Sequence, residues 1–386
     1  MPKPRIALLV NFIAPSRVAV YERLGTLLDL IILHGGPEKN RSSWNEITLE
    51  AARVRRVSGW QLSMTKRDKG KPIDHWFLHL EPGYIIELLR ERPEAVITDE
   101  MGFRTLVGLA YGKWFHKPVW VWWGGTPHTE RHVGWFRKFL RGMVARWAEH
   151  WISYGQTSTE YLLSLGISRE KVLQVQNCVD ESWYGAEAEA VLEVGCRPML
   201  LHVGRMVAGK GIAEFLHAAA RLQREGIKFS IVLVGEGRDS AKLQQLAEGL
   251  QLKNIRFYPA QPPKAMPVFY RGADVLVFST MTDVWGLVAN EAILSGVPVL
   301  CSQYAGCAVE LFDCECIFDP ADENQFVNAL RKAVTGQLPR ADRSRLWSSA
   351  EVGDVIANAV LASCRGKNPT DSDFKAETAT QSALEN

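Results

Sequence analysis

Long hydrophobic runs are missing from this sequence of 386 residues. Its longest apolar stretches, residues 6–10 and 119–123, are far shorter than the roughly 20 residues that a membrane-spanning helix requires. The first residues also lack the apolar core of a secretory signal, and their short apolar run predicts a first β-strand instead. We therefore expect neither a membrane span nor export, and the sequence predicts a cytoplasmic protein.

Cysteine pairs suited to metal binding are scarce as well. The chain has seven cysteines but no Cys-x-x-Cys motif. Cys314 and Cys316 lie close together, yet no His or Cys follows them at the spacing of a zinc finger. We expect no metal site, and reduced, buried thiols of the kind found in a reducing cytosol.

Charge of either sign is not in large excess, since the formal net charge is only +2. It is unevenly distributed, because residues 1–180 carry 25 Lys and Arg against 18 Asp and Glu, whereas the remainder is net negative. This asymmetry is either a scatter of solvated side chains or a basic first half that faces an anionic partner, such as a phospholipid surface or a diphosphate-bearing acceptor. Nucleic acid is not expected, because the isoelectric point is only about 8.1 and no nucleic-acid motif is present.

Short apolar runs alternate with amphipathic stretches of helix length along the whole chain, which predicts α/β architecture with parallel sheets covered by helices. Two segments, residues 35–50 and 58–80, interrupt the alternation with polar sequence and are predicted as loops. The length favours two domains. The expected division is a first domain at 1–180, a linker at 181–197, a second domain at 198–345, a helix at 349–363 that packs back on the first domain, and a disordered tail at 366–386.

The first stretch with chemical information is LLHVGRMVAGKGIAEFL (200–216). A strand ends at Gly204, a loop carries Arg205 and Lys210, and a helix begins near Gly211. Amide groups at a helix start together with two cations form a site for phosphate or diphosphate. The stretch resembles a P-loop but lacks the Ser or Thr that binds magnesium, so a P-loop nucleotidase is disfavoured. A plain strand–loop–helix turn with solvated cations is the structural alternative.

The second stretch surrounds Asp283 and Glu291, which lie on either side of seven residues. Asp283 is predicted on a loop, and Glu291 about one turn into a helix that begins near Leu287. A loop carboxylate there can accept hydrogen bonds from sugar hydroxyls, and a helix carboxylate can bind a ribose diol. Gly286 between them allows the backbone to approach a ligand closely. Alternatively, Asp283 caps the helix and Glu291 is a satisfied surface residue.

In combination the two stretches resemble the retaining glycosyltransferases of family 4, whose two facing Rossmann-like domains are known as the GT-B fold. The resemblance rests on the order GR-x4-KG, then VGEG at 234–237, then D-x7-E, then A-x3-G-VPV. Asn-Cys-Val-Asp at 177–180 also stands where the family has Asn-Gly-Val-Asp, so that Cys178 replaces a glycine. The motifs cover residues 150–310.

The resemblance implies roles for individual residues. Arg205 and Lys210 would bind the donor diphosphate, Glu291 the ribose, and Asp283 the sugar hydroxyls near the reacting carbon. Arg205, Lys210 and Asp283 are accordingly the candidate catalytic residues. Asp283 stands where the family more often has Glu, and Trp285 where it often has Phe. The further donor-binding candidates are Gly204, Gly235, Glu236, Trp285, Gly286 and Leu287.

The function implied by the resemblance is transfer of a hexosyl group, with retention, from a nucleotide diphosphate sugar to a hydroxyl acceptor. The donor would be of the UDP or GDP type, no metal or cofactor is expected, and the pathway would be polysaccharide or glycolipid assembly. Two alternatives remain open. One is a GT-B enzyme that acts like an epimerase or phosphorylase, and the other is a non-catalytic protein that binds sugar nucleotides.

Acceptor-side candidates lie in loops of the first domain: Asn11 and Arg17 after the first strand, Glu100 after a later strand, and His128 in the loop after the Trp122-bearing strand. The helix expected at 132–150 combines bulky aromatic residues with four cations. Such a helix either lies on an anionic membrane, with a lipid-linked acceptor, or packs its aromatic residues against the sheet. The first alternative places the protein peripherally at the inner face of the membrane.

Overall fold

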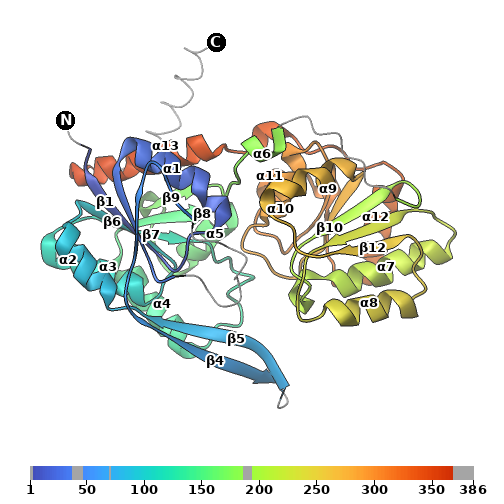
Figure 1. The fold of residues 1–386 in the computed structure, drawn as a ribbon, viewed down its shortest axis with the longest axis horizontal. Coiled ribbons are helices and arrows are strands. Elements are labelled where there is room, and N and C mark those ends of the chain that lie inside the picture. Colours follow the sequence, from blue (N-terminus) through green and yellow to red (C-terminus); the bar gives the residue numbers. More distant parts are fainter. Residues whose placement is uncertain (1–2, 37–46, 69–70, 186–193, 368–386) are drawn as a thin grey trace, which may run out of the picture.

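The computed structural model describes residues 3–36, 47–68, 71–185 and 194–367, with the backbone alone for 61–79. Two α/β domains lie side by side (Figure 1), each built on a parallel sheet, so the predicted fold class is confirmed. The sheet of the first domain has the strand order β3-β2-β1-β6-β7-β8-β9. Its strands are β1 (Arg5–Val10), β2 (Asp29–His34), β3 (Arg53–Arg56), β6 (Ala95–Asp99), β7 (Val119–Trp123), β8 (His150–Tyr154) and β9 (Val172–Val175).

Strand residues of the first domain alternate between two hydrophobic cores. Ala7 and Leu9 of β1 face one core, and Ile6 and Leu8 face the other. Both faces are covered by helices, which explains why the central strands are continuous apolar runs. The first core is covered by α2 (Gly83–Glu91), α3 (Phe103–Phe115), α4 (Trp135–Trp147) and α5 (Gly155–Ser164), and the second by α1 (Val18–Leu27) and α13 (Ser349–Cys364).

The segment predicted as a loop at 58–80 is instead a two-stranded antiparallel ribbon, so this prediction was wrong. Strands β4 (Trp60–Asp68) and β5 (Lys71–Leu80) pair from Trp60 with Leu80 to Asp68 with Lys71. The ribbon forms a sheet of its own and projects away from the first domain (Figure 1). Its sequence is more polar than that of the buried strands, because a projecting ribbon is not covered by helices on both faces along its length.

The second domain has a parallel sheet with the order β12-β11-β10-β13-β14-β15. Its strands are β10 (Met199–Val203), β11 (Ser230–Val234), β12 (Ile255–Tyr258), β13 (Val275–Phe278), β14 (Val299–Ser302) and β15 (Ile317–Phe318). The order reverses between β10 and β13, and ligands of such sheets bind at the carboxyl ends of the strands beside this switch point. Its helices are α7 (Ile212–Arg224), α8 (Ser240–Gly249), α9 (Met266–Gly272), α10 (Leu287–Leu294), α11 (Ala308–Leu311) and α12 (Glu323–Val334).

The chain crosses between the domains twice. The first crossing passes through the short helix α6 (Ser182–Gly185), and the second brings α13 back onto α1 of the first domain (Figure 1). Arg23 of α1 forms a two-pronged ion pair with Asp354 of α13, with N–O distances of 2.7 and 2.9 Å. Most of the expected tail at 366–386 lies outside the described residues, as does part of the expected linker.

Within the described part of the chain, no helix is both long enough and apolar enough to cross a membrane.

Candidate active site

The loop after β10 has the geometry expected of a phosphate-binding turn. Gly204 has a φ of +155°, and Gly211, with a φ of +65°, stands at the N-terminus of α7. A Cβ atom on Gly211 would lie 1.9 Å from the carbonyl oxygen of Ser279, so only glycine fits there. Arg205 is exposed, and its side chain has no hydrogen-bond or ion-pair partner among the described residues. This cation is therefore available to a ligand.

Lys210 and Asp283, which come from the two separate motif stretches, form an ion pair. Lys210 Nζ lies 2.5 Å from Asp283 Oδ2, and each side chain is 19% exposed. The other carboxylate oxygen of Asp283 accepts a hydrogen bond from the backbone N–H of Trp285 at 3.3 Å. The backbone N–H of Asp283 donates to the carbonyl oxygen of Tyr304, which holds the loop beside the end of β14. The fold thus places both stretches at one edge of the sheet.

The helix that follows Asp283 begins at an open N-terminus. Gly286 has a φ of +107°, and no side chain caps the start of α10 at Leu287. A Cβ atom on Gly286 would lie 2.3 Å from the ring of Phe278. The first amide groups of a helix have no partner within the helix and carry partial positive charge. This end of α10 therefore suits an anionic group.

Glu291 lies one turn further along α10, where two tyrosines surround its carboxyl group. The Tyr270 hydroxyl donates a hydrogen bond to Glu291 Oε2, and Tyr184 also bonds to this carboxylate. Burial raises the pKa of Glu291 to about 7, although both hydrogen bonds act to lower it. A carboxylate has about four acceptor positions, so two remain for a diol. Sequence reasoning missed Tyr184 and Tyr270, because no spacing pattern links them to Glu291.

Gly235 and Glu236 form the neighbouring loop, after β11. Gly235 has a φ of +144°, and a Cβ atom there would lie 2.0 Å from the carbonyl oxygen of Gly204. The carbonyl oxygen of Glu236 accepts a hydrogen bond from the N–H of Met206 at 2.9 Å, while the Glu236 side chain is exposed. The two glycine-bearing loops are therefore packed directly on each other at the same edge of the sheet.

Trp285 requires a correction, because its side chain is unavailable to a ligand. The residue is fully buried, and its indole N–H donates to Asn290 Oδ1 at 2.9 Å. A Cβ atom on Gly155 of the first domain would lie 2.4 Å from the indole ring. The amide group of Asn290 in turn donates to the carbonyl oxygen of Asn177 at 3.1 Å. Trp285 was expected to contact the donor, but its side chain instead packs between the two domains. Only its backbone N–H contacts Asp283.

The acceptor-side candidates Asn11 and Glu100, after β1 and β6, belong to one cluster around the buried Arg104. Arg104 donates to the Asn11 side chain and forms an ion pair with Glu100 at 3.1 Å. Burial and the charge of Glu100 raise the pKa of Asp99 to about 6, against the opposing effects of Arg104 and Arg17. Glu100 itself is largely exposed. Of this group, Glu100 is the residue most open to an acceptor.

Arg17 was expected to face the cleft but lies in the core of the first domain. Its guanidinium carbon stacks 4.6 Å from the ring of Trp122 and 4.5 Å from that of Tyr154. The side chain is 9% exposed. The stacking indicates that Arg17 packs β7 against β8, and a role in acceptor binding stays a prediction.

His128 reaches across to the second domain. Its Nε2 lies 3.0 Å from the carbonyl oxygen of Met281, and its ring stacks on that of Tyr304 with centroids 4.4 Å apart. Both partners flank the loop that carries Asp283. His128 is thus the first-domain candidate that the fold brings to the donor side. Tyr304 was missed, although its place directly after β14 could have identified it.

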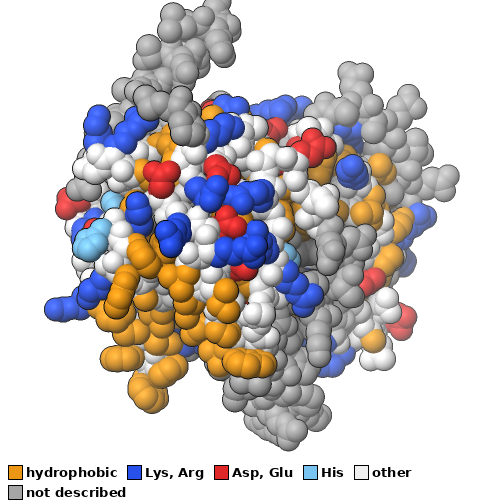
Figure 2. Space-filling view, turned by 60° about the vertical axis from the view of Figure 1, so that its left-hand side comes forward, with side chains coloured by type: hydrophobic (Ala, Val, Ile, Leu, Met, Phe, Trp, Pro, Cys, Tyr) orange, Lys and Arg blue, Asp and Glu red, His pale blue; other side chains and the backbone are white. Residues whose placement is uncertain are grey.

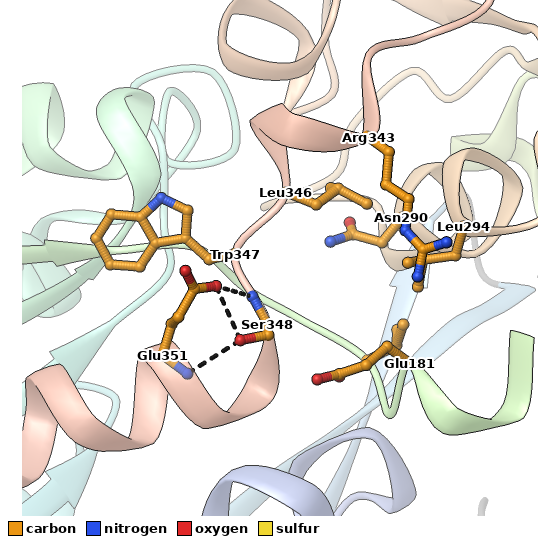
Figure 3. Close-up of a pocket in the computed structure, with 9 residues that line it drawn as sticks. Glu181, Asn290, Leu294, Arg343, Leu346, Trp347, Ser348 and Glu351 are labelled. Atoms are coloured by element: carbon orange, nitrogen blue, oxygen red, sulfur yellow. Dashed lines mark hydrogen bonds between the residues drawn. The ribbon is translucent and has the colours of Figure 1, made fainter. Parts of the chain in front are cut away.

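A separate cavity of about 110 Å³ lies at the domain junction rather than at this edge of the sheet (Figure 3). It is lined by the first crossing at Glu181, by Asn290 and Leu294 of α10, and by the second crossing and α13 at 343–351. The Ser348 hydroxyl and the Glu351 carboxylate form the capping box of α13 beside it. The Glu181 carboxylate accepts hydrogen bonds from Ser349. These contacts tie the two crossings together.

The fold and this site define a class of protein: two Rossmann-like domains of the GT-B type, with cations and an open helix N-terminus at the carboxyl ends of the second sheet. Among the residues that the structure describes, no three His, Cys, Asp or Glu side chains are grouped as metal ligands.

Comparison with known proteins agrees with this class. Residues 187–349, which include most of the second domain, match the family "Glycosyl transferases group 1", in agreement with the resemblance that the motifs carry. The chain is similar to D-inositol 3-phosphate glycosyltransferase of Nocardia farcinica, with 29% identity over 48% of this chain and 40% of the relative. It is also similar to the lipopolysaccharide glucosyltransferase WaaG of Escherichia coli, with 31% identity over 42% and 47%. The matched part spans less than half the length of these curated relatives.

Solved structures share the fold over nearly the whole chain. HepE of Anabaena, solved in complex with UDP-glucose, superposes with a TM-score of 0.71 at 16% identity and covers 93% of this chain and 100% of that one. Sucrose-phosphate synthase of Thermosynechococcus elongatus gives a TM-score of 0.68 at 16% identity and covers 99% of both chains. The GT-B fold is therefore confirmed.

Proposed function

We propose that this protein transfers a hexosyl group from a nucleotide diphosphate sugar of the UDP or GDP type to a hydroxyl acceptor. The observation that carries the proposal is the pairing of Lys210 with Asp283 at 2.5 Å, beside the exposed Arg205 and the open N-terminus of α10. Cations and helix amides suit a diphosphate, and carboxylates suit the hydroxyls on either side of it. UDP-glucose in the HepE structure is consistent with such a donor.

We propose transfer with retention and without a metal. The bond between the anomeric carbon and the diphosphate oxygen breaks while the acceptor oxygen attacks from the same face. The acceptor proton passes to the departing diphosphate, whose growing charge is stabilised by Lys210, Arg205 and the amides of α10. Asp283 would hold sugar hydroxyls, and Glu291 the ribose. His128 would contribute from the acceptor side.

The acceptor is proposed to be lipid-linked, within polysaccharide or glycolipid assembly at the inner face of a membrane. The net charge of +7 on residues 1–180 supports this, as do the exposed aromatic residues of α4. The alternative in which Trp135, Phe139 and Trp147 pack against the sheet is contradicted, because all three are exposed.

Product analysis tests the proposed reaction. The protein is incubated with UDP- and GDP-sugars and a membrane lipid extract, in EDTA and without added metal. The expected result is a glycolipid whose anomeric proton shows the donor's configuration by NMR. Inversion of that configuration, or loss of transfer in EDTA, would overturn the corresponding part of the mechanism. Nucleotide-sugar binding without transfer to any acceptor would favour the non-catalytic alternative.

A further inference from the structure

Large hydrophobic side chains gather on the outer side of the first domain, next to Lys and Arg side chains (Figure 2). Three helices contribute them, and α3 lies between α2 and α4, with contacts to both. Trp114 and Trp135 are each 80% exposed. We name this surface the apolar face and define it by Ile85, Ile86 and Leu89 of α2, Trp114 and Phe115 of α3, and Trp135, Phe136, Phe139 and Trp147 of α4.

Helix α4 is oriented opposite to an ordinary surface helix, which turns its apolar stripe to the core. Its buried residues are Arg141 and Val144, whereas its aromatic residues point outward. The Arg141 guanidinium lies 5.0 Å from the ring of Trp123 and forms an ion pair with Glu130. The inner side of α4 is thus held by a satisfied cation. The outer aromatic residues therefore contribute little to the packing of the domain.

Cations accompany the apolar face on α3 and α4, where no acidic side chains are present. Lys113, Lys138 and Arg146 are exposed on α3 and α4, and neither helix contains Asp or Glu. Lys113 Nζ lies 5.9 Å from the ring of Trp147, which links the cations to the aromatic residues.

The two acidic residues of α2 form ion pairs with arginines of strand β3. Glu87 pairs with Arg55, and Glu91 pairs with Arg53 at 3.1 Å and with Arg55 at 2.9 Å. The outward charge of the three helices is therefore positive.

We propose that the apolar face docks on a lipid bilayer that contains anionic lipids. Monomeric proteins rarely expose contiguous apolar patches of more than a few hundred Å² unless something binds there. Tryptophan favours the membrane interface, and each nearby cation strengthens attraction to anionic headgroups. A second copy of the chain is a poorer occupant, because a symmetric contact would bring the cations of both copies together without acidic partners.

The docking surface deepens the proposed peripheral contact, since it extends over α2 and α3 as well as α4. It rests on the proposed function only for the identity of the acceptor. Helix α4 begins at Trp135, seven residues after His128, which contacts the second domain beside Asp283. The apolar face is thus linked by a short segment to the loop that reaches the donor site.

Vesicle co-sedimentation of the full-length protein tests the proposal. Vesicles of phosphatidylcholine alone are compared with vesicles that also contain phosphatidylglycerol, at low and physiological salt. We expect binding to the anionic vesicles that weakens with salt but persists, because apolar insertion is not screened. Absence of binding at both salt concentrations would overturn the proposal.

Substitutions outside α4 test the extent of the surface. The pair Ile86→Ser and Trp114→Ser is expected to weaken vesicle binding by roughly tenfold, as is the pair Trp135→Ser and Phe139→Ser. Leu163→Ser on α5 is the matched control, because its side chain is exposed but lies outside the apolar face. Unchanged binding by the first pair would contradict a contribution from α2 and α3.

A charge-reversal set tests the role of the cations. Changing Lys113, Lys138 and Arg146 to Glu should abolish binding to anionic vesicles, whereas the same change at three exposed lysines of the second domain should not. The control lysines are Lys228, Lys253 and Lys264.

Three further measurements separate the outcomes: nucleotide-sugar binding, sugar transfer and the association state. Binding of the nucleotide sugar should be unchanged, which shows that the fold is intact and that the donor site is independent. Vesicle binding without any sugar transfer would leave the docking surface standing while the proposed function fails. Sedimentation that reveals a concentration-dependent dimer, lost with Trp135→Ser and Phe139→Ser, would assign the apolar face to a second copy and overturn the proposal.

Discussion

Lys210 and Asp283 neutralise each other across the two loops of the candidate donor site, with Nζ and Oδ2 2.5 Å apart. Both side chains are largely shielded from water, so the pair is stronger than an exposed one. A diphosphate that binds Lys210 must share this cation with Asp283. The pair therefore couples the group proposed to bind the diphosphate to the group proposed to bind the sugar.

Asp283→Asn should separate these two roles. The substitution releases Lys210, so binding of the nucleoside diphosphate alone is expected to stay equal or become tighter. The nucleotide sugar should lose a charge-assisted hydrogen bond worth about 1.5–3 kcal/mol, or roughly 10- to 100-fold in Kd. Calorimetry with both ligands measures this difference, with Asp313→Asn as an exposed control. Equal losses for both ligands would contradict the role of Asp283.

Glu291 should make nucleotide-sugar binding dependent on pH. Burial raises its pKa to about 7, so the free protein gains the ribose-binding carboxylate only as the pH rises through this value. Affinity for the nucleotide sugar is expected to increase from pH 6 to pH 8, and Glu291→Gln should bind weakly and without this increase. The sugar conjugate is the ligand to use, because a free terminal phosphate titrates near pH 6 itself.

Stability should follow the opposite trend at the same residue. A carboxyl group whose pKa is raised on folding stabilises the protein fully below its ordinary pKa, and this contribution is lost as the pH rises through about 7. Relative to the wild type, Glu291→Gln should therefore gain up to about 3 kcal/mol in unfolding free energy between pH 5 and pH 8. A constant difference in thermal midpoint across this range would refute a buried carboxyl group.

Asn290→Ala should loosen the domain junction. The amide of Asn290 links the indole N–H of Trp285 to the carbonyl oxygen of Asn177, and its loss leaves both groups buried without a partner. Each such group costs about 1–3 kcal/mol, so the melting temperature should fall by several degrees. We expect kcat to fall more than nucleotide affinity, since the Asn290 side chain is hydrogen-bonded to Trp285 and Asn177 rather than to Lys210 or Glu291.

Local sequence features could predict much of the architecture and of the site. Short strand-like runs located the strands of both large sheets, and the central strands are continuously apolar because helices cover both of their faces. The position of Lys210 and Asp283 at carboxyl ends of neighbouring strands then brought them together. The motif could predict the site because Lys210 and Asp283 lie on the loops that form it.

Features that depend on distant parts of the chain could not be predicted in this way. The burial of Trp285 depends on Gly155 and Asn177 of the other domain, which no spacing in the donor motif reveals. The outward orientation of the α4 aromatic residues could not be predicted either. The periodicity of α4 shows two faces but not which of them packs against the sheet. Arg141 holds this orientation by forming an ion pair with Glu130. The sequence alone was equally compatible with the aromatic residues packing against the sheet.

The most direct test of the donor site is calorimetric titration of the wild type, Lys210→Ala and Arg205→Ala with UDP and GDP and their sugar conjugates. We predict that the wild type binds one nucleotide series and that each variant binds it roughly 10- to 100-fold more weakly, with the larger loss for Lys210→Ala because the unpaired Asp283 would then repel the diphosphate. Lys264→Ala on the same domain serves as a control. Unchanged affinity in both variants, with unchanged melting temperatures, would contradict the assignment of this site to a nucleotide diphosphate sugar.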